Sequence, residues 1–420
     1  MKKLFSCFTA AAALCGTIHA GNLQSVADIA RRAEQGEKLN VVFFGCSLTF
    51  GANSSNPDLT SYRGNMAEKL KAAYPLARWS FYDAAIGGTD SILGVFRLER
   101  DVLRFKPDLV FVDFTLNDNG RRHKDVNSAA YEKIIRTLLN SGAAVMPVFL
   151  TGKNFVTEPD LSVLLRRTEH IELAERFRLS YGDVIGEMNR LYKAGKLDPD
   201  KIWPAGRFDA THPNDLGYQY YADIIFDAFQ AAARKKVAPV LPQELHGSGF
   251  RHTLRFRLAD AAALPENWQV VDCETRAAAY DFTCSRWMGT LAAAGNFVRK
   301  GYDQFDLIKD PPAPESLTLC FKGQTILLFG ESTFFSGTLR YAIDGKDRGI
   351  ADTARMGKLF GSSAYYSIIL ASGLDPEKEH VLTLTPVLAP GIPQQVKIES
   401  VCVAGAFPVS VELENTKGRL

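Results

Sequence analysis

Short apolar runs separated by helical patterns dominate the first half of the chain. Residues 41–44 form an unbroken apolar run, and similar runs follow at residues 79–86, 109–114 and 144–150. Between them apolar residues recur every three or four positions, as expected of helices. Continuous apolar runs are typical of strands in a parallel sheet that helices cover on both faces. The sequence therefore predicts an α/β domain, which a last helix at about residues 213–234 closes.

The second half has a different pattern. Residues 237–249 combine prolines and glycines without any periodicity, as a linker does. Beyond them lie short β-prone segments separated by turn-rich text, at residues 317–321, 325–329, 338–343, 365–370, 380–384 and 395–403. A chain of 420 residues also exceeds what one hydrophobic core usually supports. We therefore predict an α/β domain at 21–236, a linker at 237–249 and an antiparallel β-sandwich at 250–420.

The first 20 residues have the pattern of an export signal. Two lysines precede an apolar stretch that is too short for a stable membrane anchor, and a small residue, Ala20, ends it. We interpret residues 1–20 as a signal peptide and expect a secreted or periplasmic protein. Cys15 offers lipid anchoring as an alternative, but Leu14 directly before it argues against that modification.

Charge and cysteine content narrow the possible partners. Loss of residues 1–20 removes two of the 49 lysines and arginines, which leaves them equal in number to the 47 acidic residues. A chain without net charge gives no reason to expect a nucleic-acid partner, and no later apolar stretch is long enough to predict an integral membrane span. An odd number of cysteines remains, so one or two disulfides are possible with the pairing open: Cys46, Cys273, Cys284, Cys320 and Cys402.

Two segments carry the residue types of nucleophilic catalysis. Ser47 lies between Gly45 and Gly51 directly after the first apolar run, at the edge of the sheet where open α/β folds bind ligands. Asp209 and His212 are three residues apart just before the last helix, so the carboxylate can orient the imidazole while its other nitrogen faces a serine. Taken singly, the first pattern also fits a solvated turn, and the second a helix-capping turn.

Two further segments follow the second and third apolar runs and offer hydrogen-bond donors. Gly87-Gly88 presents backbone N–H groups without side-chain bulk, and Asn117 presents a carboxamide. Donors fixed around a developing oxyanion are what acyl transfer requires. Each segment alone could equally be a tight turn or a polar loop.

The four segments occur in one order along the chain: Gly-x-Ser-Leu-Thr-x-Gly, Ile-Gly-Gly-Thr, Leu-Asn-Asp and Asp-x-x-His-Pro. Over residues 38–232 this pattern resembles the SGNH (GDSL-like) hydrolase superfamily. The resemblance implies a three-layer α/β/α flavodoxin-like domain, with Ser47 as nucleophile and His212 as base oriented by Asp209. It also implies an oxyanion hole formed by Ser47, Gly88 and Asn117.

Secreted members of that superfamily with an added β-sandwich resemble carbohydrate O-acetylesterases. The resemblance therefore implies an acylated carbohydrate, or another small ester, as the substrate. The alternatives are a lipolytic esterase or thioesterase, and a catalytically silent glycan-binding protein. No cofactor and no metal are expected, because histidines, cysteines and carboxylates show no ligand spacing and the glycines form no phosphate-binding motif.

Two residues depart from the pattern of the superfamily. Cys46 occupies the place of the aspartate in the GDSL form, and Asp83 stands where asparagine is common. If Cys46 continues the strand, its side chain points away from that of Ser47. We expect a buried cysteine rather than a second nucleophile.

For several aromatic and loop residues the sequence is compatible with more than one function. Trp203, Arg207 and the loop at residues 53–62 are candidates for lining the acyl or alcohol pocket, or for packing beneath the histidine loop. Trp268, Trp287 and Phe335 could be sugar platforms, although aromatic residues in β-rich text are more often part of a core.

Overall fold

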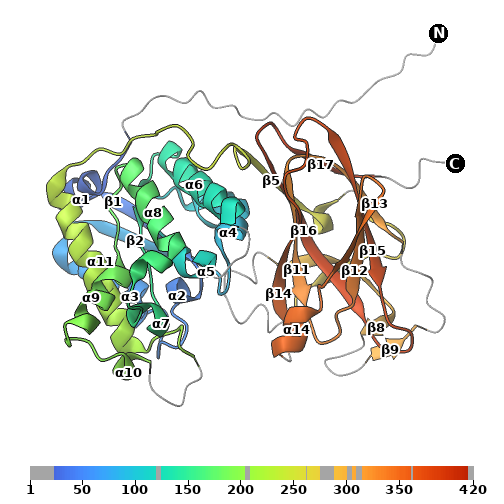
Figure 1. Ribbon diagram of the computed structural model, residues 1–420, viewed down its shortest axis with the longest axis horizontal. Helices are drawn as coiled ribbons and strands as arrows, with labels where there is room; N and C mark the ends of the chain where they lie inside the picture. Colours follow the sequence, from blue (N-terminus) through green and yellow to red (C-terminus); the bar gives the residue numbers. More distant parts are fainter. Residues whose placement is uncertain are drawn as a thin grey trace, which may run out of the picture.

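The computed structural model describes residues 23–119, 124–203, 209–261, 263–274, 288–299, 305–308, 315–360 and 363–414. The described part forms a parallel sheet covered by helices, followed by a region of antiparallel strands (Figure 1). This confirms the predicted α/β fold followed by a β-rich region. The expected signal peptide, Arg207 and Trp287 lie outside the described residues.

The first region is built on a four-stranded parallel sheet with the order β2-β1-β3-β4. The strands in that order are Arg78–Ala85, Lys38–Gly45, Leu109–Asp113 and Ala144–Pro147. All four apolar runs therefore form strands. The fourth strand is shorter than its run, because after Pro147 the chain continues only as an isolated bridge between Val148 and Gly182.

Helices cover both faces of this sheet. One face packs against α4 (Ser91–Asp101), α6 (Lys124–Asn140) and α8 (Leu165–Arg176). The other packs against α1 (Val26–Glu34), α3 (Tyr62–Ala73), α9 (Val184–Lys193) and α11 (Asp215–Lys235). Short helices lie in the loops: α2 (Ser47–Phe50), α5 (Thr115–Asn119), α7 (Lys153–Val156) and α10 (Pro199–Ile202), with 3-10 turns at Leu103–Phe105 and Leu161–Val163. The predicted three-layer arrangement is thus observed.

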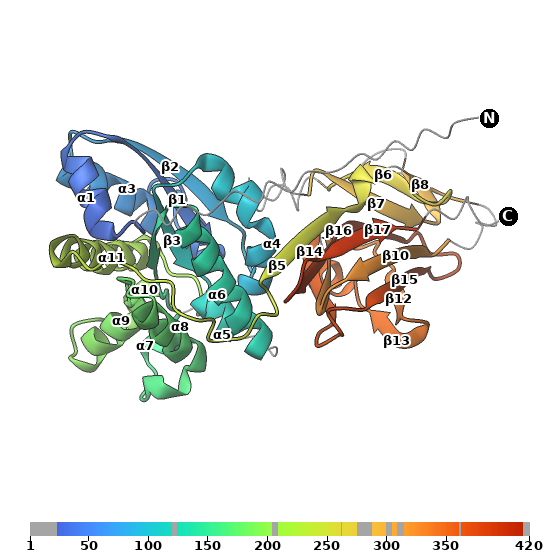
Figure 2. The same ribbon diagram turned by 90° about the horizontal axis from the view of Figure 1, so that it is seen from above.

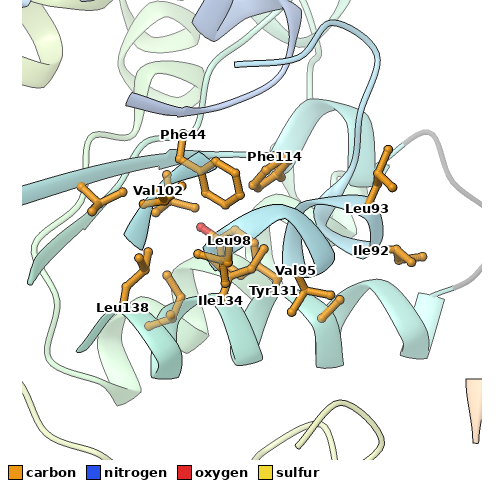
Figure 3. Packing of buried hydrophobic residues seen from close by; sticks show 14 of the residues in the cluster. Phe44, Ile92, Leu93, Val95, Leu98, Val102, Phe114, Tyr131, Ile134 and Leu138 are labelled. Atoms are coloured by element: carbon orange, nitrogen blue, oxygen red, sulfur yellow. The ribbon is translucent and has the colours of Figure 1, made fainter. Parts of the chain in front are cut away.

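The two cores of this domain follow from the alternation of side chains along the strands. In β1, Val42 and Phe44 point to α4 and α6, whereas Val41 and Phe43 point to α3 and α11. The ring of Phe44 meets that of Phe114 edge-on at 5.0 Å, above the side chains of α4 and α6 (Figure 3). The apolar runs lack alternation because both faces of the sheet are buried.

The β-rich region consists of two larger sheets and a small hairpin. In the first sheet the order is β13 (Lys346–Ala351), β12 (Thr338–Ile343), β15 (Glu379–Val387), β10 (Leu317–Lys322) and β17 (Ser410–Leu413). In the second it is β14 (Ala364–Ala371), β11 (Thr325–Ser332), β16 (Gln395–Gly405), β7 (Thr290–Gly295) and β6 (Gln269–Asp272), and β5 (His252–Arg257) also pairs with β16. The hairpin joins β8 (Phe297–Arg299) to β9 (Phe305–Leu307), and α14 (Arg355–Phe360) precedes β14.

Six of these strands coincide with the predicted β-prone segments. The turn-rich text at residues 343–349 predicts a turn between strands, but β13 begins within it at Lys346. Asp344 and Gly345 both have positive φ values, 54° and 73°, so they form a two-residue turn that leads directly into the next strand.

The strands at the centre of the second sheet are buried on both faces. In β11, Ile326 and Leu328 point into the core between the two β-sheets, whereas Leu327 and Phe329 join the core that contains α4. Figure 2 shows α4 beside this sheet, near β5. The ring of Phe96 on α4 lies 6.1 Å from that of Phe250. The two regions therefore share one continuous apolar core.

The segment between the regions is tied to α6. α11 ends at Lys235 and β5 begins at His252, and the predicted linker at residues 237–249 lies between them. The Glu132 carboxylate accepts the backbone N–H groups of Leu245 at 3.0 Å and His246 at 2.8 Å. These bonds hold the connecting segment against the α/β domain.

The structure also bears on the expectations about membrane-spanning segments and disulfides. None of the described helices combines the length and apolar character that crossing a bilayer requires. In the part of the chain that the structure describes, Cys46, Cys273 and Cys402 are free thiols. Cys284 lies outside the described residues.

The core beneath α4 gives a stability prediction. Ile134 is fully buried between α6, α4 and the sheet. Ile134→Ala removes apolar contacts and leaves a cavity, so we expect the free energy of unfolding to fall by about 2–5 kcal/mol. Leu76→Ala is the control, because Leu76 is 70% exposed and its truncation should change stability by less than about 0.5 kcal/mol. Urea denaturation of both variants measures this; similar effects of the two substitutions would contradict the packing.

Candidate active site

Ser47 is placed by a sharp turn between β1 and α2. β1 ends at Gly45, and Ser47 begins α2 after the extended residue Cys46. A Cβ atom on Gly45 would lie 2.2 Å from Thr49 Oγ1, so the turn requires a glycine there. Gly51 ends the helix with φ of 95°, a conformation that favours glycine. The spacing of the two glycines around Ser47 thus follows from the backbone of the turn.

The loop that precedes α11 brings His212 and Asp209 to this serine. His212 Nε2 lies 2.7 Å from Ser47 Oγ, and His212 Nδ1 lies 2.7 Å from Asp209 Oδ2. Asp209 Oδ1 accepts the backbone N–H groups of Thr211 at 2.9 Å and His212 at 3.0 Å. α11 then begins after Asn214, whose side chain caps it by accepting from Gly217 N–H. The three predicted residues form one continuous hydrogen-bonded chain.

Asn53 completes the polar surroundings of Asp209. Its Nδ2 donates to Asp209 Oδ2 at 2.9 Å and to the His212 carbonyl at 3.3 Å. Partial burial opposes ionisation of Asp209, but the hydrogen bonds from the His212 ring and backbone outweigh it and hold the pKa of the carboxyl below its usual value. Asp209 is therefore a carboxylate at neutral pH.

The loop at residues 53–62 is bound to the start of α11. Asp215 accepts hydrogen bonds from Ser55 N–H at 2.7 Å and from the Thr60 hydroxyl at 2.9 Å. This loop therefore supports the histidine loop, one of the two functions that the sequence left open. Asn53 is one residue in it that sequence reasoning did not single out.

Cys46 and Asp113 form the floor beneath the serine turn. The Cys46 thiol donates to Asp113 Oδ2 at 3.4 Å, and the Thr49 hydroxyl donates to the same oxygen at 2.8 Å. Burial, together with the charge of Asp113, raises the pKa of the Cys46 thiol well above its usual value. Cys46 is buried as expected, although the reason differs: the strand ends before it, and its side chain packs under the turn.

Asp83 and Arg63 hold the other side of the serine turn. Arg63 Nε donates to the Thr49 carbonyl at 2.6 Å, and its Nη2 donates to the Phe50 carbonyl at 2.9 Å. The same guanidinium lies 3.2 Å from the Asp83 carboxylate. The aspartate at position 83 therefore neutralises an arginine that supports α2.

Gly88 and Asn117 face a common cavity. Gly88 has φ of 73° and follows β2, while Asn117 lies on α5 after β3. The neighbouring Asp118 anchors α5, because its Oδ1 accepts Ser91 N–H and the Asn127 carboxamide, both at 2.9 Å. The two predicted donors thus come together at the carboxyl edge of the sheet.

This cavity lies between the two regions of the chain and has a volume of about 450 Å³. Gly88, Asn117 and their neighbours form one wall: Thr89, Asp90 and Leu93. The β-rich region forms the other wall: Asp352, Arg355, Met356, Tyr365, Tyr366, Ser367 and Ile368. Hydroxyl, carboxylate and guanidinium groups thus line this space together with apolar and aromatic side chains, beside the predicted oxyanion donors. No local pattern predicts the second wall, because its residues lie more than 230 positions farther along the chain.

The aromatic candidates are mostly structural. Trp203 is buried in the core between the sheet and α11, so it packs beneath the histidine loop. Trp268 is buried in the core of the β-rich region, and its indole N–H donates to the Glu315 carbonyl at 2.8 Å. Phe335 lies against Phe297 and Phe334. In the part of the chain that the structure describes, no three His, Cys, Asp or Glu side chains are grouped to hold a metal.

The buried carboxyl of Asp113, beneath the serine turn, gives a prediction about how the stability of the protein depends on pH. Burial raises the pKa of Asp113 to about 7, against about 3.9 in an unfolded chain. Between these values the unfolded state loses a proton that the folded state keeps, so this group lowers the free energy of unfolding by up to about 1.4 kcal/mol per pH unit as pH rises. The Asp113→Asn variant has no carboxyl at this position. Its free energy of unfolding should therefore fall less between pH 4 and 7 than that of the wild-type protein. Urea denaturation across this range tests it; parallel curves would contradict the assignment.

Comparisons with known proteins agree with this geometry. Residues 43–220 match the model of the GDSL-like lipase/acylhydrolase family. A two-domain esterase (CEX) active on acetylated mannans, co-crystallized with mannopentaose, is similar in structure with a TM-score of 0.71 and 21% sequence identity, over 92% of this chain and 95% of that one. A second structure of such an esterase matches at 0.71 and 22% identity, over 92% and 97% of the two chains. No curated protein matches the chain by sequence.

The similarity to the two-domain esterases extends over both regions and shows that the whole fold is shared. The family match spans Ser47, Gly88, Asn117, Asp209 and His212. The segment at residues 43–220, within the α/β domain, is therefore similar to the GDSL-like lipase/acylhydrolase family.

Proposed function

We propose that this protein is a secreted serine esterase that removes small acyl groups, chiefly O-acetyl groups, from carbohydrates. The observation that carries the proposal is the hydrogen-bonded chain from Asp209 through His212 to Ser47, with 2.7 Å at each link. Such a chain activates a hydroxyl that is otherwise a weak nucleophile.

In the proposed reaction His212 Nε2 takes the proton of Ser47 Oγ as this oxygen attacks the ester carbonyl. The tetrahedral intermediate then collapses, and the alcohol oxygen of the sugar leaves with the proton from His212. A water molecule, deprotonated by the same imidazole, attacks the acyl enzyme and releases the carboxylic acid. Asp209 holds the imidazole in one tautomer and stabilises its charged form.

The negative charge of the intermediate requires fixed donors. We assign this function to the backbone N–H groups of Ser47 and Gly88 and to the carboxamide of Asn117. Ser47 is the first residue of α2, so its N–H is not used by the hydrogen bonds within that helix. Gly88 and Asn117 line one cavity, which supports their acting on the same oxygen.

The lining of the cavity supports a carbohydrate alcohol. Asp90, Asp352 and Arg355 bring charged groups to its walls, and Thr89 and Ser367 bring hydroxyl groups. Such groups suit the hydroxyls of a sugar better than a long acyl chain. The structurally similar two-domain esterase acts on acetylated mannans, which also supports this substrate class. Export through the proposed signal peptide would bring the enzyme to such polymers.

Acetate release distinguishes this function from its alternatives. The purified protein should release acetate from acetylated mannan or another acetylated glycan, and should hydrolyse nitrophenyl acetate faster than the octanoate. A preference for the octanoate with no acetate release from any acetylated glycan would favour a lipolytic esterase. Glycan binding without hydrolysis of any ester would favour the catalytically silent alternative.

Substitutions in the site should separate the proposed functions of its residues. Ser47→Ala should abolish both turnover and fluorophosphonate labelling, because no acyl enzyme can form. Asn117→Ala should lower kcat by about a hundredfold to a thousandfold with little change in KM, because an oxyanion donor acts mainly in the transition state. Ser141→Ala, at an exposed position after α6, is the control and should keep full activity. Activity retained in Ser47→Ala would refute the assignment.

A further inference from the structure

A tyrosine of the β-rich region reaches across to the glycine pair after β2. The hydroxyl of Tyr365, on β14, donates to the Gly87 carbonyl at 2.6 Å. A Cβ atom on Gly88 would lie 2.8 Å from that hydroxyl, so the approach depends on a glycine at position 88. The Tyr365 ring lies 5.9 Å from that of Phe329, within the core shared by the two regions.

The bonded carbonyl and the proposed oxyanion donor belong to the same peptide group. Gly87 C=O and Gly88 N–H lie in one plane and point in opposite directions, since the peptide is trans. A hydrogen bond that fixes the carbonyl therefore also fixes the direction of the N–H. Such a bond also polarises the peptide and makes its N–H a stronger donor.

The neighbouring residues are held within the α/β domain, whereas the glycine pair is conformationally the most permissive part of the loop. The Thr89 hydroxyl donates to the Ile86 carbonyl at 2.7 Å, and Asp90 caps α4 by accepting Leu93 N–H at 3.0 Å. The Thr89 N–H also donates to the Ile86 carbonyl at 3.3 Å, so Gly87 and Gly88 are the two central residues of a turn, and the peptide between them carries the hydrogen bond from Tyr365. The hydrogen bond from the Tyr365 hydroxyl to the Gly87 carbonyl holds this peptide in one orientation.

We propose that Tyr365 is a positioning residue for the oxyanion hole: it holds the Gly87–Gly88 peptide so that Gly88 N–H faces the developing negative charge. The inference rests on the proposed esterase function and on Gly88 as a donor. Preset donors stabilise a transition state because they need no reorganisation during the reaction. The β-rich region then contributes to the rate of the chemical step itself.

The test is Tyr365→Phe, which keeps the ring and removes only the hydroxyl. On nitrophenyl acetate, which lacks a sugar, we expect kcat to fall roughly three- to tenfold, as the loss of one ordinary hydrogen bond predicts. KM should change little, and the rate constant of fluorophosphonate labelling should fall by a similar factor. Incorporation of 4-aminophenylalanine at position 365 restores a donor on the ring and should recover part of kcat.

The matched control is Tyr341→Phe. Tyr341 belongs to the same region, and its hydroxyl donates to the Leu370 carbonyl at 3.3 Å, away from the glycine pair. This variant should keep wild-type kcat. Denaturation midpoints of both variants show whether a kinetic change merely follows a loss of stability.

The outcomes separate this inference from the function on which it rests. If Ser47→Ala is inactive but Tyr365→Phe has wild-type kcat and labelling rate, the positioning function is wrong and the esterase stands. If Tyr365→Phe raises only KM, Tyr365 binds substrate and the inference is also wrong. If Ser47→Ala keeps its activity, the esterase proposal fails, and the inference falls with it.

Discussion

The packing of α4 against the outer face of the six-stranded sheet determines how this molecule is organised. Leu327 and Phe329 of β11 contribute to the same core as Phe44 and Ile134 of the α/β domain. Because that contact is apolar and continuous, it fixes the orientation of the two regions. The cavity wall formed by β14 and α14, and the approach of Tyr365 to Gly87, both depend on it.

The same helix also fixes the strand ends that lead into the site. Arg97 of α4 is fully buried, and its guanidinium donates to the Gly45 carbonyl at 2.7 Å and to the Ala84 carbonyl at 2.5 Å. It lies 4.5 Å from the centre of the Phe44 ring and pairs with Asp101 at 3.3 Å. A buried charge persists only with such partners. One residue thus joins the strand before Ser47 to the strand before the glycine pair.

Local sequence patterns made most of the fold predictable, whereas contacts between residues far apart in the sequence could not be predicted from them. The apolar runs gave the parallel sheet, and the Asp209–His212 spacing predicted the geometry seen beside Ser47. Sequence reasoning did not find Tyr365, because nothing local relates a tyrosine on β14 to a glycine 278 positions earlier. For Trp268 the sequence favoured a core position over a sugar platform, and the side chain does lie in the core of the β-rich region.

Strands β11 and β16 are buried on both faces, and this limits the sequence changes that the protein can tolerate. Val401 and Val403 of β16 point inward, while Cys402 and Ala404 point to the α/β domain, so no face of these strands is adapted to water. Recombination that joined either half to a foreign partner would expose a contiguous apolar sheet surface, which favours aggregation. Each half therefore needs the other to cover its apolar surface, and a substitution on one side of the shared face must fit the side chains on the other.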